Sequence, residues 1–151
     1  MTTQEKLAEE LKGAMRTGDA ARLSVIRLLR SAIKNKEIDK GKGQKLTEEE
    51  VLQLISSAMK QRRESIEQFA KGGRQDLVEQ EEKELTILQS FLPEQISDEA
   101  LRIKVQEAIA QSGATDVKEM GKVMKLLIPQ LVGKAEGNKI SQVVRECLGQ
   151  K

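Results

Sequence analysis

The chain has 151 residues, of which 33% are charged, 38% are hydrophobic and 1% are aromatic. Its 26 Lys and Arg residues nearly balance its 24 Asp and Glu residues, so the net charge of +2 excludes nucleic-acid binding through overall basicity. With two Phe and no Trp or Tyr, the core must consist of Leu, Ile, Val, Met and Ala, a set that favours helices over a β-sandwich.

The first 40 residues predict two helices. Thr2 and Glu5 match a capping box for a helix that ends near Gly18, and Asp19 can cap a second helix that runs to about residue 38. The apolar side of the second helix is formed by Val25, Ile26, Leu29, Ala32 and Ile33. Its opposite side is basic and is formed by Arg27, Arg30 and Lys34.

The segment DKGKGQK, which starts at Asp39, has two glycines and no apolar residue and therefore predicts an exposed loop. Thr47 and Glu50 repeat the capping-box pattern at the start of a long amphipathic helix that ends at Gly72. A fourth helix is predicted over residues 74–92. Its acidic cluster is interpreted as a charged helix face rather than a metal site, because no neighbouring motif completes an octahedral set of ligands: Glu79, Glu81, Glu82 and Glu84.

Pro93 marks a predicted domain boundary, because proline cannot continue the fourth helix and disfavours a helical backbone at Leu92. Three shorter helices follow, with caps predicted at Ser97, at Thr115 or Asp116, and at Asn138. The predicted fold class is therefore all-α. An N-terminal four-helix domain spans residues 1–93, and a small C-terminal three-helix tail domain spans residues 94–151.

The absence of certain residue types excludes several kinds of chemistry. Without histidine, the chain cannot form Ser-His-Asp triads, Cys-His pairs or histidine metal sites. Its single cysteine, Cys147, cannot form a disulfide within the chain, and its helical spacing predicts a small buried side chain. We identify no catalytic residue, cofactor-binding motif or metal-ligating set in the sequence.

The N-terminal segment MTTQEKLAEELKGAM has acidic residues where a secretory signal would have an apolar core. No apolar run in the chain approaches the length of a membrane span. These two observations predict a cytoplasmic protein with no membrane partner.

The segment MGKVMKLLIPQLVGKAEGNKIS combines glycines and lysines with apolar residues. It is not a P-loop, because Asn138 stands where that motif requires its second glycine. We expect Gly133 to end one helix in the left-handed conformation and Gly137 to turn the chain into the next helix. Gly121 is predicted inside a helix, where glycine costs about 1 kcal/mol relative to Ala, so we expect another backbone or a phosphate chain to approach it closely.

Five lysines of this region are candidate nucleic-acid-binding residues, because lysine side chains contact phosphates: Lys118, Lys122, Lys125, Lys134 and Lys139. The first three are predicted to share one helix face, and the last two to lie beside a helix N-terminus. The apolar face of the same helix is predicted to consist of Val117, Met120, Met124, Leu127, Ile128 and Leu131. A helix junction without any binding role is the alternative interpretation of the segment.

Four segments resemble the YqeY-like proteins: RLSVIRLLRSAIKNKEI, KQRRESIEQFAKGGRQDL, ELTILQSFLPEQIS and MGKVMKLLIPQLVGKAEGNKISQVV. The C-terminal half of that family is similar to the tail of GatB, the B subunit of the glutamine-dependent aspartyl/glutamyl-tRNA amidotransferase. Glu136 departs from the family pattern, in which we expect Asp. The resemblance implies an all-helical domain joined to a tail of the kind that engages tRNA. It also implies the label of a carbon-nitrogen ligase with glutamine as amide donor, although no catalytic site supports that activity here.

Two functions are expected from these observations. The first is an accessory protein related to the amidotransferase B subunit. Its C-terminal lysines would bind either tRNA or a partner protein of the amidotransferase or aminoacyl-tRNA synthetase type. The second is a protein-interaction module whose long helices between Thr47 and Phe91 offer a groove to a partner. Transfer of ammonia by the chain itself is disfavoured, because a glutaminase needs an activated nucleophile.

Overall fold

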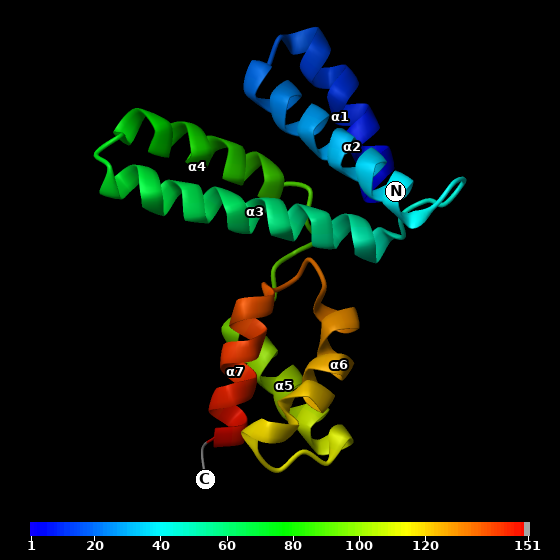
Figure 1. Cartoon of the computed structure of the whole chain (residues 1–151), viewed down its shortest axis with the longest axis vertical. Coiled ribbons are helices and arrows are strands. Elements are labelled where there is room, and N and C mark those ends of the chain that lie inside the picture. The colour runs from blue at the N-terminus through cyan, green and yellow to red at the C-terminus, as the bar shows by residue number, and fades with distance from the viewer. Residues whose placement is uncertain (150–151) are drawn as a thin grey trace. The chain divides into compact units, whose positions relative to one another are not determined.

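The computed structural model of the chain describes residues 1–149. These residues form seven α-helices and one short 3₁₀ helix, without any β-strand, which confirms the predicted all-α class (Figure 1). Contacts within the chain divide it into two compact units, Met1–Leu92 and Pro93–Lys151. That each unit folds as an independent domain remains a prediction.

Two helical hairpins make up the unit Met1–Leu92. Helices α1 (Thr3–Thr17) and α2 (Ala20–Lys40) form the first hairpin, and α3 (Glu48–Lys71) and α4 (Gln75–Gln89) form the second (Figure 1). Apolar side chains from all four helices meet in one core. Burial of these side chains stabilises the amphipathic helices against one another. The core includes Leu7, Ile26, Leu29, Val51, Ile55, Met59, Leu88 and Phe91.

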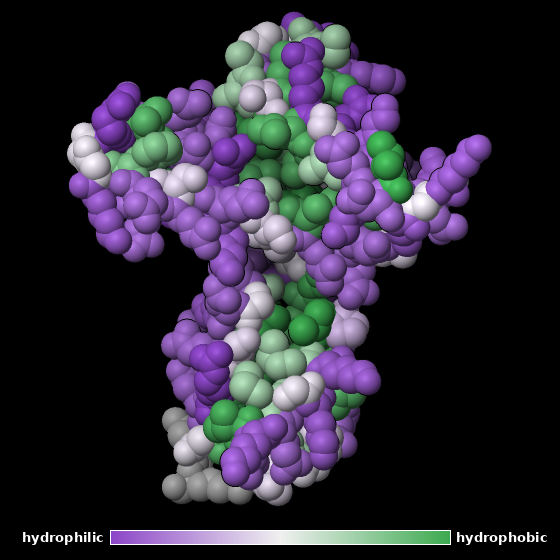
Figure 2. Space-filling view, in the orientation of Figure 1, coloured by the Kyte–Doolittle hydropathy of each residue, from purple (hydrophilic) through white to green (hydrophobic). Residues whose placement is uncertain are grey.

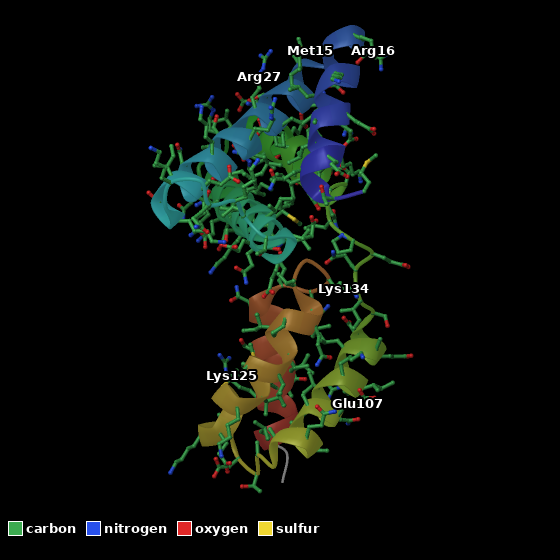
Figure 3. The ribbon with its side chains drawn as sticks, turned by 90° about the vertical axis from the view of Figure 1, so that its right-hand side faces the viewer. Met15, Arg16, Arg27, Glu107, Lys125 and Lys134 are labelled. Atoms are coloured by element: carbon green, nitrogen blue, oxygen red, sulfur yellow. The ribbon has the colours of Figure 1, made fainter. Side chains whose placement is uncertain are left out.

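The helix starts in this unit follow the predicted caps. The hydroxyl of Thr2 accepts a hydrogen bond from the N–H of Glu5 at 3.2 Å, and Thr47 caps Glu50 in the same way, also at 3.2 Å. Asp19 caps α2 through its carboxylate. Met15 is 58% exposed and lies near the free end of the first hairpin (Figure 3).

A half-buried ion pair joins α3 to α4. One guanidinium nitrogen of Arg62 lies 3.3 Å from a carboxylate oxygen of Glu81 and 3.3 Å from one of Glu84. Glu84 is buried, although the sequence predicted that the acidic cluster of α4 faces solvent. Two of the four acidic residues in that cluster therefore hold the second hairpin together.

The unit Pro93–Lys151 contains α5 (Asp98–Ser112), the 3₁₀ helix η1 (Val117–Glu119), α6 (Met120–Leu131) and α7 (Gly137–Gly149). Its separate aliphatic core is built from Leu101, Val105, Ala108, Val123, Leu127, Leu131, Ile140 and Val144, with smaller contributions from neighbours. The caps predicted at Ser97 and Asp116 are present. On the face that Figure 2 shows, both units are largely hydrophilic, with hydrophobic residues gathered in patches.

Candidate nucleic-acid interface

The loop between α6 and α7 reverses the chain at Gly133. This residue has a φ of 77°, the left-handed conformation that the sequence predicted for it. The N–H groups of Lys134 and Ala135 both donate to the carbonyl oxygen of Leu131, at 2.9 and 3.1 Å. Because these two donors are already used within the loop, the loop backbone does not offer them to a phosphate.

The carbonyl groups of the same loop bind the segment that precedes α5. The side-chain amide of Gln95 donates to the carbonyl oxygen of Gly133 at 2.7 Å, and the N–H of Ile96 donates to that of Lys134 at 2.9 Å. The loop is therefore a structural junction within its unit. Any contact with a phosphate must come from side chains around it.

Helix α7 begins two residues earlier than a cap at Asn138 predicts. Gly137 is its first residue, so Asn138 lies inside the first turn and does not cap the helix. The carbonyl of Glu136 accepts the N–H of Ile140 at 3.0 Å, which is the first intrahelical bond. Gly137 does not have a positive φ, so its role is to start α7 rather than to make a left-handed turn.

Helix α6 shows most of the predicted apolar face: Leu127 and Leu131 are buried, and Met120 and Met124 pack against the core of the unit. Val123, Leu127 and Leu131, four residues apart, are its buried residues, whereas Val117 and Ile128 are 40% and 39% exposed. Val123 was not among the residues predicted for this face, and Val117 lies in η1, before α6 starts.

Two of the five candidate lysines are in ion pairs. The ammonium group of Lys122 lies 3.2 Å from the carboxylate of Glu119, and that of Lys139 pairs with Asp98 in the first turn of α5. The hydrogen bond from Lys122, helped by one from Thr115, lowers the pKa of Glu119. A phosphate that bound Lys122 or Lys139 would have to replace these carboxylates.

The other three candidates, which we call the open lysines, are Lys118, Lys125 and Lys134. All three side chains are exposed, and none forms an ion pair with another residue of the described chain 1–149. Figure 3 shows Lys125 projecting outward from α6 and Lys134 at the loop between α6 and α7. The structure thus separates the five predicted residues into three with an available charge and two whose charge is compensated.

Gly121 lies on the exposed side of α6, as the second residue of that helix. Apart from the backbone of its own helix turn, a Cβ atom added to it would meet no atom of residues 1–149 within 4 Å. The expected close approach by another helix of the chain is therefore wrong, because the space beside Gly121 is open.

Charge is distributed unevenly along the chain. Residues 93–151 contain nine Lys and Arg against eight Asp and Glu, so this unit is nearly neutral as a whole and the open lysines are a local feature. Residues 20–46, which include α2, contain eight Lys and Arg against two Asp and Glu. Sequence reasoning identified the basic side of α2 but assigned it no role.

Cys147 is half-buried beside the core of its unit, which agrees in part with the buried side chain expected for it. Its sulfur lies 3.6 Å from a guanidinium nitrogen of Arg102, which also forms an ion pair with Glu146 at 2.8 Å. Within residues 1–149, we find no group of three or more His, Cys, Asp or Glu placed to hold a metal ion. None of the helices described there has the length and apolar character needed to cross a membrane.

Comparison with known proteins identifies the family. Residues 4–148 match the family model described as Yqey-like protein. The chain belongs to the YqeY-like protein family. Three similar proteins all bear the name "Altered inheritance of mitochondria protein 41, mitochondrial". That of Lachancea thermotolerans is 46% identical over 86 residues, which cover 57% of this chain and 46% of the relative.

Two further proteins of this name align over more of the YqeY-like chain. The Kluyveromyces lactis protein is 36% identical over 130 residues, which cover 86% of this chain and 67% of the relative. The Candida glabrata protein is 30% identical over 138 residues, which cover 90% and 72%.

The prediction of a cytoplasmic protein is contradicted by these relatives, because their names place them in mitochondria. That prediction was based on the lack of a secretory signal and of a membrane span. Neither feature distinguishes the cytoplasm from the interior of an organelle, so the inference went further than its evidence.

Proposed function

We propose that this YqeY-like protein is a tRNA-associated accessory protein, related to the amidotransferase B subunit, that contacts RNA phosphates through the unit Pro93–Lys151. The observation that carries the proposal is the set of open lysines, Lys118, Lys125 and Lys134, whose charges are not compensated by a carboxylate of the described chain. They lie in the part of the sequence that resembles the tail of the B subunit.

Lys122 and Lys139 take part as secondary contacts. Each must give up a carboxylate partner to bind a phosphate, but an exposed ion pair contributes about 1 kcal/mol or less, so the exchange is inexpensive. The open lysines need no such exchange, and we therefore expect them to contribute more to the affinity for RNA.

Gly121 supports the same assignment. A helix that contains glycine at an exposed position loses stability relative to one with Ala, and no side chain or neighbouring helix among residues 1–149 fills the space beside Gly121. A phosphate chain that crosses α6 one turn before Lys125 would use that space. Gly121 then allows the closest approach of RNA to the helix.

This mode of binding predicts little dependence on base sequence. The chain has no Trp or Tyr and only two Phe, one of which, Phe91, is buried in the core. Without aromatic side chains to stack on bases, recognition has to depend on the shape and the phosphates of folded RNA. The proposal is limited to binding and assigns no amide transfer to this chain.

The alternative prediction, a partner groove along the long helices between Thr47 and Phe91, has less support. The large hydrophobic side chains of α3 and α4 that we can describe are buried or half-buried. The strongly exposed ones are in other elements of the chain, and two of them, Leu28 and Ile38, are on α2.

A titration of the full chain with bulk tRNA, at about 50 mM and about 200 mM salt, tests the proposal. The test variant combines Lys118→Ala, Lys125→Ala and Lys134→Ala. Its matched control combines Lys12→Ala, Lys60→Ala and Lys83→Ala, which removes three exposed lysines from the other unit. We expect the test variant to bind tRNA more weakly and its salt slope to fall by about 0.7 to 0.9 for each lost contact.

Two outcomes contradict the proposal. In the first, the unsubstituted chain does not bind tRNA even at the lower salt concentration. In the second, the control variant loses as much affinity as the test variant, which means that tRNA binds by diffuse charge and not at the open lysines.

A further inference from the structure

Three adjoining hollows follow the exposed side of α2. The first, of about 470 Å³, lies between α1 and α2, the second, of about 440 Å³, lies on α2 itself, and the third, of about 430 Å³, lies where α2 meets the following loop. Ser31 borders both the first and the second hollow, and Lys34 borders both the first and the third. We call this continuous surface the α2 groove.

Apolar side chains line the α2 groove along its length. Leu7 and Ile33 are nearly inaccessible and form its floor between the two helices. Leu28 and Ile38 stand on its exposed side, and they are 54% and 66% exposed. Since they are ten residues apart on one helix, they lie about 15 Å apart along its axis.

The rim of the α2 groove is positively charged. Arg27, Arg30 and Lys34 are exposed, and none of them forms an ion pair with any residue in the described range 1–149. Figure 3 shows the side chain of Arg27 extending outward from α2. The acidic residue that lines the groove, Glu37, already accepts a hydrogen bond from the N–H of Leu46 at 3.2 Å.

This combination of apolar floor and basic rim selects among partners. RNA phosphates would satisfy the arginines and Lys34 but would leave Leu28 and Ile38 in water. An apolar helix would cover the two aliphatic side chains but would bury cations without a partner, which is costly. A helix with one apolar face and acidic flanks satisfies both requirements.

We propose that the α2 groove binds an acidic amphipathic α-helix of a partner protein. The partner helix lies along α2, its apolar residues at spacings of three and four contact Leu28, Ile38 and the floor, and its carboxylates pair with Arg27, Arg30 and Lys34. Because α2 has 21 residues and is therefore about 30 Å long, a partner helix of about 20 residues can use the whole groove.

Binding of a synthetic peptide to the full chain tests this proposal. The probe is a fluorescent peptide of about 20 residues with Leu at helical spacings of three and four and Glu at most other positions. A scrambled peptide of identical composition, in which Leu no longer falls on one face, is the control. Fluorescence anisotropy measures affinity, and NMR chemical shifts of the labelled protein locate the binding surface.

The variant Arg27→Glu with Arg30→Glu reverses two rim charges, and Lys60→Glu with Lys83→Glu reverses two exposed charges on α3 and α4 as a matched control. We expect the rim variant to bind the peptide at least about tenfold more weakly and the control variant to bind it nearly unchanged. A second variant, Leu28→Ser with Ile38→Ser, keeps the charge and should also weaken binding. Because Leu28 and Ile38 lie outside the core, we expect the melting temperature to change little.

The expected result is binding of the amphipathic peptide, not of the scrambled one, with shifts concentrated along α2. Equal binding of both peptides, equal loss in the rim and control variants, or shifts outside the groove would overturn the proposal. Competition by tRNA at this surface would assign it to nucleic acid, and sedimentation showing a dimer disrupted by Leu28→Ser would assign it to a second copy of the chain. Loss of the open lysines should not affect peptide binding, so this test and the tRNA test fail independently.

Discussion

The two units differ in how polar contacts support their aliphatic cores. In Met1–Leu92, side chains are joined across helices: Arg62 pairs with Glu81 and Glu84, and the N–H of Thr3 donates to both carboxylate oxygens of Glu48 at 3.1 Å. In Pro93–Lys151, the carbonyl groups of the loop between α6 and α7 accept hydrogen bonds from the segment before α5, and two exposed ion pairs, Arg102 with Glu146 and Lys139 with Asp98, join α5 to α7. The ion pairs of Arg62 in the first unit are thus half-buried, whereas the ion pairs that join helices of the second unit are exposed.

Removing the arginine from its ion pairs should have the largest effect on stability. In Arg62→Ala, the half-buried carboxylates of Glu81 and Glu84 lose their cation, and we expect the free energy of unfolding to fall by about 2 to 4 kcal/mol. Denaturant unfolding followed by circular dichroism measures the change. Arg27→Ala, which removes an exposed arginine without an ion pair, is the control and should change stability by less than about 0.5 kcal/mol. Similar losses in the two variants would mean that the pair does not hold α3 to α4.

Loss of the hydrogen bond between Gln95 and Gly133 should lower the free energy of unfolding less. Gln95→Ala removes the donor to the carbonyl of Gly133, and we expect a loss of about 0.5 to 1.5 kcal/mol. Gln106→Ala, an exposed change on α5, is the matched control within the same unit. If Gln95→Ala proved as harmless as the control, Ile96 alone would suffice to anchor the loop.

Local sequence signals predicted the helix starts well. The caps Thr2, Thr47 and Ser97 were identified because a capping side chain binds an N–H only a few residues away. A short stretch of sequence is therefore enough to recognise it. The start of α7 was missed because Gly137 and Asn138 are both acceptable near a helix N-terminus. The buried residue Val123 of α6 was missed because apolar residues lie on more than one side of that helix, among them the exposed Leu126 and Ile128.

The candidate sites were harder to predict, because they depend on residues distant in sequence. The pairing of Lys122 with Glu119 is local, but that of Lys139 with Asp98 joins two different helices and requires the folded unit. The basic side of α2 was predicted from the helical spacing of Arg27, Arg30 and Lys34. The hollows beside it result from packing against α1, which periodicity does not describe.

Gly121→Ala should raise stability while it lowers affinity for RNA. The added methyl group meets open space, and replacing glycine in a helix should stabilise the chain by about 0.5 to 1 kcal/mol. If a phosphate chain approaches α6 at this position, the same methyl group should weaken tRNA binding, and the bulkier Gly121→Leu should weaken it further. Thermal melts and tRNA titrations measure the two effects separately. Higher stability with unchanged tRNA affinity would remove Gly121 from the proposed interface.

The smallest expected effect concerns an exposed ion pair of the first unit. A hydrogen bond from Lys40 at 2.6 Å, together with hydrogen bonds from Thr47, lowers the pKa of Glu50 from 4.5 to about 2. Because the folded chain binds this proton more weakly than the unfolded chain, the stabilisation is fully present above pH 4.5 and is lost as the pH falls toward 2. It should be small, since both side chains are accessible to water.

Comparing the chain with Glu50→Gln across this pH range isolates that contribution. The difference between their unfolding midpoints in denaturant should be constant near neutral pH and should shrink as the pH falls from about 4.5 toward 2. Glu49→Gln, at the neighbouring exposed position in the first turn of α3, controls for the loss of a negative charge near the helix N-terminus. A difference that persisted unchanged to the lowest pH would show that Lys40 does not stabilise α3 through Glu50. The stabilising ion pairs of the first unit would then be the half-buried ones of Arg62, in contrast to the exposed ion pairs of the second unit.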